Sequence, residues 1–313
     1  MYGSAARKTL PLQRTVEGWL DRAASALLAP DDGPAIDFSR PPGEAALTNP
    51  ASVSWRIFKN PVSLFIGGIT AVILEFAEPR VRTGVWEYTD FRTRPARRIR
   101  RTGLAAMVTV YGPRSAAEAM IAQVRRLHGR VRGRTPTGAC YSANDPELLS
   151  WVQATAAFGF LEAYHAYVAP LSATDRNRYY SEGQPAAALY GATAAPASEA
   201  EVYTLFEAMR GKLESSLILL EFLNIVRKSP VLPGPLRHAQ PLFVAAAVSL
   251  VPAWARSLLA LPDALCLRNW QAHIVRRAGA AAERMMLASS PAVQSCLRMG
   301  LPADYLYGGV GSG

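Results

Sequence analysis

The sequence has few of the residues that build metal and redox sites, since its 313 residues include only three cysteines and four histidines. Cys140, Cys266 and Cys296 lie far apart and form no C-x-x-C pair. This spacing excludes a disulfide framework and a paired-cysteine zinc site, and it favours a reducing cytoplasmic location. The histidines show no H-E-x-x-H spacing, which argues against a metal centre built from several histidines.

Common catalytic motifs are absent as well. The chain contains no G-x-S-x-G elbow, no P-loop and no G-x-G-x-x-G after a strand. Serine hydrolases of that type, P-loop enzymes and dinucleotide-binding enzymes are therefore not indicated. No apolar run follows Arg7, Lys8 and Arg14, so we expect no signal peptide.

Long uninterrupted hydrophobic runs are also missing. Residues 62–74 are apolar but include Gly67 and Gly68, and residues 241–261 include Pro252. Because a membrane-spanning helix needs about 20 consecutive apolar residues, we expect both segments to be buried core helices. Peripheral contact with a membrane stays open.

Positive charge comes almost entirely from arginine, because lysine occurs only at positions 8, 59, 212 and 228 while the net charge is +10. Six arginines form a cluster: Arg92, Arg94, Arg97, Arg98, Arg100 and Arg101. Such a cluster could follow a phosphate backbone, but no aromatic stacking series or nucleic-acid motif accompanies it. We therefore expect no nucleic-acid partner, and instead a solvated basic face or internal ion pairs.

What the chain does contain favours helices. Half of its residues are hydrophobic, alanine is abundant and strand-like alternation is scarce, which is typical of an all-α protein with a single large multi-helix domain. We predict a helical arm with a linker over residues 1–50, a main body over 51–307 and a flexible tail over 308–313. The main predicted helices cover residues 62–77, 95–110, 115–128, 146–168, 202–210, 215–226, 241–261 and 269–289.

His128 is the most informative histidine. Its helix is predicted to begin with a Ser115–Glu118 capping box, and its apolar face holds Met120, Val124, Leu127 and His128. Arg125 and Arg132 flank the imidazole in sequence. A buried neutral imidazole near cations suits an iron ligand of haem, whose macrocycle supplies the other ligands. It equally suits a core histidine bonded to a carbonyl. His165 is the second candidate ligand, although its position near a helix end is typical of a surface histidine.

A second group of candidates precedes His128. Arg98, Arg101 and Thr102 lie at i, i+3 and i+4 and therefore share a helix face, which could meet carboxylates or a bound oxygen species. Glu75 and Glu78 end an apolar segment, where buried carboxylates need partners. Each is interpreted either as half of an ion pair with the arginines or as a base with a raised pKa.

Three blocks of the chain resemble the family that contains the latex-clearing proteins, or rubber oxygenases, and the MpaB-like oxygenase of mycophenolic acid biosynthesis. The resemblance covers about residues 50–300. It rests on Ser54-Trp55-Arg56 through Pro61 to Glu78-Pro79-Arg80; on Asp90-Phe91 with Arg98-Ile99-Arg100-Arg101-Thr102, Tyr111-Gly112 and Arg125-Arg126-Leu127-His128; and on Asn144-Asp145-Pro146 to Trp151-Val152.

The resemblance implies an all-α fold with a globin-like core, one haem b with its iron, and oxygenase activity with dioxygen on a small apolar substrate such as an isoprenoid or other alkene. His128 matches the proximal ligand, and Arg125 and Arg132 match the flanking arginines. Arg98, Arg101 and Thr102 match the distal helix, with Arg101 where the latex-clearing branch has lysine. The acidic catalytic residue matches Glu78 best and Glu75 next.

The chain departs from many relatives at three positions, where Glu78, Tyr88 and Gln153 replace histidine. Either His128 holds the iron, then, or the chain binds no haem. The alternative function is a non-catalytic helical protein that binds haem or a lipid. A basic protein that contacts membranes peripherally is a third class.

Overall fold

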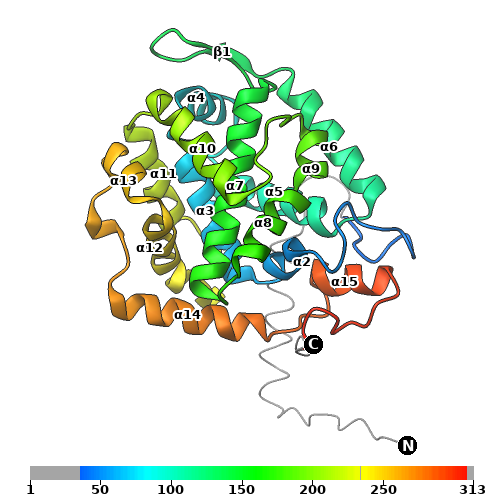
Figure 1. The fold of residues 1–313 in the computed structure, drawn as a ribbon. Helices are drawn as coiled ribbons and strands as arrows, with labels where there is room; N and C mark the ends of the chain where they lie inside the picture. The colour runs from blue at the N-terminus through cyan, green and yellow to red at the C-terminus, as the bar shows by residue number, and fades with distance from the viewer. Residues whose placement is uncertain (1–35, 233, 309–313) are drawn as a thin grey trace, which may run out of the picture.

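The computed structural model describes residues 36–232 and 234–308, which form an all-α body with one small hairpin (Figure 1). The first half contains α2 Val53–Phe58, α3 Pro61–Glu75, α4 Pro79–Tyr88, α5 Pro95–Tyr111, α6 Arg114–His128, β1 Arg132–Arg134, β2 Cys140–Ser142 and α7 Pro146–Tyr167. The second half contains α8 Ala173–Glu182, α9 Gln184–Tyr190, α10 Glu199–Met209, η1 Arg210–Lys212, α11 Leu217–Lys228, η2 Gly234–Ala239, α12 Gln240–Leu250, α13 Ala253–Leu258, η3 Asp263–Leu265, α14 Asn269–Glu283 and α15 Pro291–Arg298. Residues 1–35 of the predicted helical arm and linker lie outside the described residues.

Two long apolar helices, α3 and α7, cross at the centre of the molecule. Gly67 of α3 and Gly159 of α7 form the crossing point, where a Cβ on Gly67 would lie 2.7 Å from the carbonyl oxygen of Gly159. α3 continues through the Gly67-Gly68 pair without a break. The absence of a Cβ on Gly67 lets the backbones of α3 and α7 come into contact. Both apolar segments predicted to be core helices are buried as expected.

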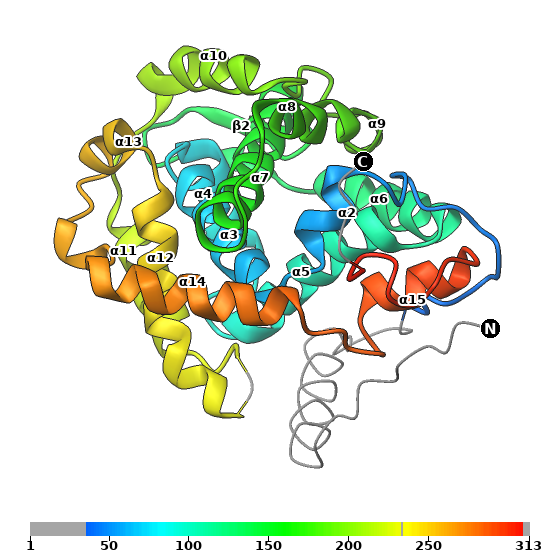
Figure 2. The ribbon, with the colours of Figure 1, turned by 60° about the horizontal axis from the view of Figure 1, so that its bottom comes forward.

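Two groups of helices pack beside this crossing. Figure 2 shows α12 and α14 beside α3 and α7, while α6 and α15 lie with α5 on the other side of the molecule. α5 and α6 are consecutive, and only Gly112 and Pro113 separate them. The charge of Arg98, near the start of α5, acts on His128 at the end of α6, so these two helix ends lie near each other.

Several predicted helices are confirmed, and their ends follow ordinary capping chemistry. Asp145 caps α7 by accepting a hydrogen bond from the backbone N–H of Glu147 at 2.9 Å, with Pro146 as the first helical residue. Ser198 caps α10 in the same way. The helix predicted over residues 95–110 is α5.

Other predictions about elements were wrong. No helix was predicted over residues 79–88, but α4 begins there at Pro79, and Glu78 caps it. The helix predicted over residues 241–261 is divided at Val251-Pro252 into α12 and α13, since a proline inside a helix removes a donor and clashes with the preceding turn. The β1–β2 hairpin and α15 were not expected.

The Ser115–Glu118 capping box is also not formed. Pro113 is the N-cap of α6 and makes no side-chain cap bond. The backbone N–H of Ser115 donates instead to the Glu44 carboxylate at 2.6 Å, and Glu118 pairs with Arg114 at 3.6 Å. A distant carboxylate thus replaces the local cap.

The segment before α2 is hydrogen-bonded to α15, near the other end of the described chain. The buried guanidinium of Arg298, in α15, donates to the carbonyl oxygens of Phe38 at 2.7 Å, Glu44 at 2.8 Å and Tyr111 at 2.8 Å. The backbone N–H of Gly43 returns a bond to the carbonyl of Arg298 at 2.7 Å. The described part of the predicted linker is therefore fixed on α15 and on the end of α5.

Within the described residues, no single helix is long and apolar enough to cross a membrane. α3 and α4 satisfy the length and composition criterion only when taken together, and they are bent by 113° relative to each other.

Candidate functional site

The candidate site lies where the end of α3, the start of α5 and the end of α6 come together. Three titratable side chains meet there: Glu75 at the end of α3, Arg98 near the start of α5 and His128 at the end of α6, and the charge of Arg98 acts on both of the others. Each is only half-buried. Helices from two different packing groups thus contribute to one cluster.

Glu75 is the unusual carboxyl of the cluster. Burial raises the pKa of Glu75 to about 7, although the positive charge of Arg98 acts in the opposite direction. A carboxyl with this pKa exchanges its proton near neutral pH, which is what a general acid or base requires.

Arg98 links the other two members. Burial lowers the pKa of Arg98, while the negative charge of Glu75 acts in the opposite direction. The guanidinium remains charged at neutral pH, because arginine loses its proton only at very high pH. It is therefore a fixed cation between a titrating carboxyl and an imidazole.

His128 is held as a neutral imidazole. Burial lowers its pKa, and the charge of Arg98 lowers it further. Its Nδ1 atom is inaccessible to solvent and has no hydrogen-bond partner among the described residues. A neutral imidazole with an unsatisfied nitrogen is more reactive toward a ligand than a core histidine bonded to a carbonyl.

The helix face around His128 is less buried than its sequence predicts. Ala117 and Ile121 are the buried residues of α6, whereas Leu127 is 45% exposed and Met120 and Val124 are half-buried. The prediction that this apolar face is buried is therefore wrong, because α6 packs on α5 and α9 through an adjacent face. The half-buried apolar side chains lie on the same helix as the imidazole.

Arg98 and Thr102 share a helix face, as their spacing predicts. The Arg98 guanidinium donates to the Thr102 hydroxyl, which in turn donates to the Arg98 carbonyl at 3.0 Å. Arg101 is exposed, and its charge lowers the pKa of Arg98. Of the three residues on this face, Arg98 is the one whose charge acts on Glu75 and His128.

Arg125 and Arg132 flank the end of α6 but do not contact His128 through any observed hydrogen bond. Arg125 donates to the carbonyl of Leu189 at 3.4 Å, and Arg132 donates to the carbonyl of Gly129 at 2.9 Å. Both side chains are exposed. Their cations lie near a helix C-terminus, where positive charge is favourable.

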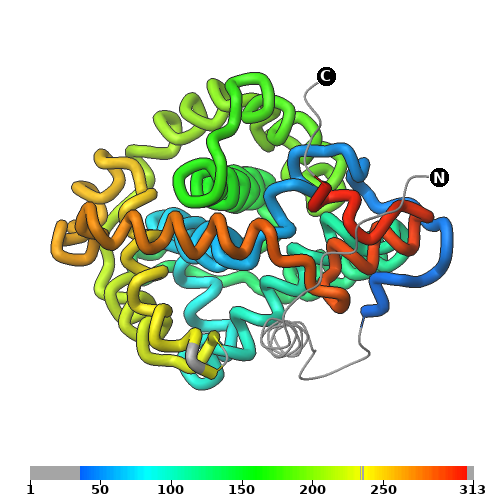
Figure 3. The backbone as a smooth tube through the Cα atoms, turned by 90° about the horizontal axis from the view of Figure 1, so that it is seen from below, coloured from blue at the N-terminus to red at the C-terminus, as the bar shows by residue number. Residues whose placement is uncertain are grey.

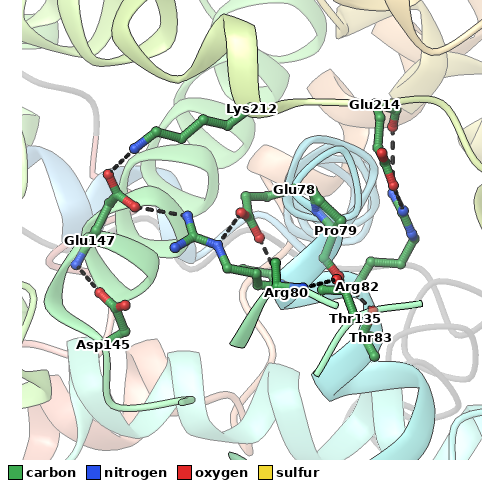
Figure 4. A network of polar contacts seen from close by, with 12 residues as sticks. Glu78, Pro79, Arg80, Arg82, Thr83, Thr135, Asp145, Glu147, Lys212 and Glu214 are labelled. Atoms are coloured by element: carbon green, nitrogen blue, oxygen red, sulfur yellow. Dashed lines mark hydrogen bonds and ion pairs between the residues drawn. The ribbon is translucent and has the colours of Figure 1, made fainter. Parts of the chain in front are cut away.

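Glu78 belongs to a different network, shown in Figure 4. It is 1% exposed, and both carboxylate oxygens are engaged: one accepts from Arg80 Nε at 2.6 Å and the other from the backbone N–H of Val81 at 2.9 Å. Arg80 also pairs with Glu147 at 2.8 Å, and Lys212 contacts the same Glu147 carboxylate. The structure thus gives Glu78 the ion-pair role, together with a capping role, and favours Glu75 over Glu78 as the titrating carboxyl.

The sequence contained a signal for this assignment. Glu78 directly precedes Pro79, and an acidic residue before proline is a typical start of a helix. Glu75 ends an apolar helix without any such role. The ranking of Glu78 above Glu75 came from the family resemblance, which took no account of this capping role.

His165, the second candidate ligand, has a structural partner. Its Nδ1 accepts a hydrogen bond from the backbone N–H of Leu171 at 2.9 Å, just beyond the end of α7. This bond fixes the turn after the helix and occupies the nitrogen. His128 therefore remains the better candidate.

A cavity of about 480 Å³ lies beside the start of α5. Its walls are formed by Arg94, Pro95, Ala96, Arg97, Arg100, Ser229 and Pro230. None of the candidate site residues lines it, so it is not part of the Glu75–Arg98–His128 cluster.

The donor chemistry of the cluster bears on its cofactor. In residues 36–232 and 234–308, no group of three or more His, Cys, Asp or Glu side chains could hold a bare metal ion. One neutral imidazole can ligate iron when a macrocycle supplies the other nitrogens. Within the cluster, His128 is the side chain that could ligate the iron of such a group.

A family model places this chain among known proteins. The model for the catalytic domain of the ER-bound oxygenase mpaB/B' and rubber oxygenase matches residues 55–284, which is well over half of the chain and includes Glu75, Arg98 and His128. No curated protein and no solved structure matches the chain. The chain therefore belongs to the mpaB/rubber oxygenase catalytic-domain family.

Proposed function

We propose that this protein is a haem-b-dependent oxygenase that acts with dioxygen on a small apolar substrate, such as an isoprenoid or other alkene. The observation that carries the proposal is the Glu75–Arg98–His128 cluster, in which one fixed cation acts both on a neutral imidazole and on a carboxyl with a pKa of about 7. Family membership supports oxygenase chemistry in general terms.

His128 would hold the iron of haem through its neutral imidazole, the form that coordinates metals. When bound, haem supplies the iron at which dioxygen chemistry takes place. Arg125 and Arg132 would bind its carboxylates, because a charge-assisted bond is stronger than the carbonyl bonds that they now make.

The other residues of the cluster would stabilise charge and move protons. Arg98 presents a cation to negative charge that develops near the imidazole, and Arg101 adds positive charge on the same helix face. The Thr102 hydroxyl orients the Arg98 guanidinium. Glu75 would accept or release a proton at its carboxyl.

The two helices that carry Arg98 and His128 also carry half-buried hydrophobic side chains. Half-buried hydrophobic side chains on α5 and α6 include Ile99, Leu104, Met107 and Met120. These side chains would exclude water from the cluster and bind a hydrocarbon chain.

An absorption spectrum of the purified protein, expressed with a haem precursor, tests the proposal. We expect a Soret band that His128→Ala abolishes and that His165→Ala leaves unchanged. The absence of a Soret band in the wild-type protein would refute haem dependence, and a normal band in His128→Ala would refute the ligand assignment. A haem protein that consumes no dioxygen with any alkene would instead support the non-catalytic alternative.

A further inference from the structure

The outward face of α14 combines apolar and basic side chains. Trp270 is 58% exposed and Ile274 is 45% exposed. Arg277 and Arg284, the second of which is the C-cap of the helix, follow them at helical spacing, so the four residues share one face and form a stripe, and His273 lies beside it. Figure 3 shows α14 running across the lower face of the molecule. The stripe is therefore presented along one side of the protein.

The inward face of α14 is fixed on the core. Val275, Gly279 and Ala282 are its buried residues. Gly279 lies so close to α7 that a Cβ there would be 2.2 Å from the carbonyl oxygen of Tyr167. The helix is consequently held rigidly, and its outward side chains are not available to the core.

The charge on the outward face has one sign. Glu283 is the only acidic residue of α14, and it points inward, where Lys59 pairs with it at 2.9 Å and Tyr164 donates to it at 2.8 Å. The outward arginines therefore have no carboxylate of their own helix beside them. A surface of this kind complements a negatively charged partner.

We propose that α14 docks this protein on the surface of a membrane that contains anionic lipids. An interfacial helix needs arginine or lysine for the lipid headgroups and large apolar side chains that enter the acyl boundary. Arg277 and Arg284 provide the first, and Trp270 and Ile274 provide the second. A nucleic acid would use the arginines but would gain nothing from Ile274, so a bilayer is the better match.

Co-sedimentation of the full chain with vesicles tests the proposal. We expect binding to phosphatidylcholine vesicles that contain phosphatidylglycerol and little binding to pure phosphatidylcholine. The double variant Arg277→Glu/Arg284→Glu should weaken binding by about tenfold or more, because each basic residue near an anionic surface contributes appreciably. The double variant Trp270→Ser/Ile274→Ser should also weaken binding. Because this loss comes from apolar contact and not from charge, high salt applied to the wild-type protein should not reproduce it.

Two variants at other surfaces serve as controls. Arg134→Glu changes an exposed arginine of the β1–β2 hairpin, which projects at the opposite end of the molecule (Figure 1), and Tyr203→Ser removes an aromatic side chain of α10 that is 47% exposed. Both should bind vesicles like the wild-type protein. Equal losses in the controls would overturn the assignment to α14.

A second measurement reports direct contact with lipid. Brominated acyl chains should quench part of the tryptophan fluorescence, and Trp270→Phe should remove that part while binding persists. Unchanged quenching in Trp270→Phe would overturn insertion of α14. Binding to single-stranded RNA or DNA without binding to anionic vesicles would overturn the proposal of a membrane partner and favour a nucleic acid.

Discussion

Gly67 and Gly159 touch backbone to backbone, and this contact sets the distance between the two central helices. A Cβ on Gly67 would lie 2.7 Å from both the carbonyl oxygen of Gly159 and the Cα atom of Phe160. Neither atom can move without moving α7. The position of Glu75, two turns further along α3, depends on the same crossing.

Alanine at this crossing should destabilise the protein. We expect Gly67→Ala to lower the free energy of unfolding by about 1–3 kcal/mol, because an added methyl group must push the helices apart. Gly68→Ala is the matched control, since a Cβ there meets only the Phe160 ring at 3.8 Å. It should be neutral or raise stability by up to about 1 kcal/mol, because alanine favours helix more than glycine does. Urea unfolding of both variants measures the difference.

Glu78 should matter for stability. We expect Glu78→Ala to lower the free energy of unfolding by about 2–4 kcal/mol, because it removes the cap of α4 and one partner of the half-buried Arg80. Glu78→Gln keeps an acceptor for the cap and should cost less. If Glu78→Gln abolished oxygenase activity in a protein of normal stability, Glu78 rather than Glu75 would be the catalytic carboxyl.

The raised pKa of Glu75 should appear in the pH dependence of stability. The unfolded chain ionises Glu75 near its ordinary pKa of 4.5, whereas the folded protein does so near 7. The folded state therefore gains from the protonated form below pH 4.5 and loses that contribution as the pH rises to about 7. Glu75→Gln, which mimics the protonated form, should lack this loss.

Thermal unfolding of the haem-free protein between pH 4 and 8 measures this effect. The midpoint temperature of Glu75→Gln, compared with wild type, should rise from pH 5 to pH 8. A constant difference across this range would show that Glu75 titrates normally.

Arg98 should control the titration of His128. Removal of the cation in Arg98→Gln is expected to raise the pKa of His128 toward its ordinary value of 6.5, although burial keeps it lower. NMR titration of the imidazole resonances measures the change, with His128→Gln to assign the signal. Arg101→Gln is the control and should leave the His128 pKa unaltered. If the two substitutions changed the pKa of His128 equally, Arg98 would have no special influence on the imidazole.

Much of the fold could be predicted from local chemistry. Pro146 after Asp145 and the Ser198 cap marked helix starts that the structure confirms. The capping box of α6 failed because Glu44, which is 71 residues away in sequence, supplies the acceptor for Ser115. Local patterns contain no information about such distant partners.

The candidate site shows the same division. Arg98 and Thr102 were placed on one face by helical spacing alone, and the structure confirms that pairing. Glu75 and Arg98 are brought near each other by the way α3 and α5 are placed in the fold. The spacing of residues within one helix contains no information about that placement. The ligand role of His128 stays a prediction.

Arg298 has a consequence for how the chain can be shortened. Its carbonyl partners at Phe38 and Glu44 precede the family-matched region, whereas Arg298 itself follows that region. Removing the N-terminal flank alone would leave the buried Arg298 cation without two of its acceptors. Removing the C-terminal flank alone would leave the carbonyls of Phe38 and Glu44 without their donor, and both losses are costly. The two flanks are therefore interdependent, and a minimal catalytic fragment must keep both or discard both.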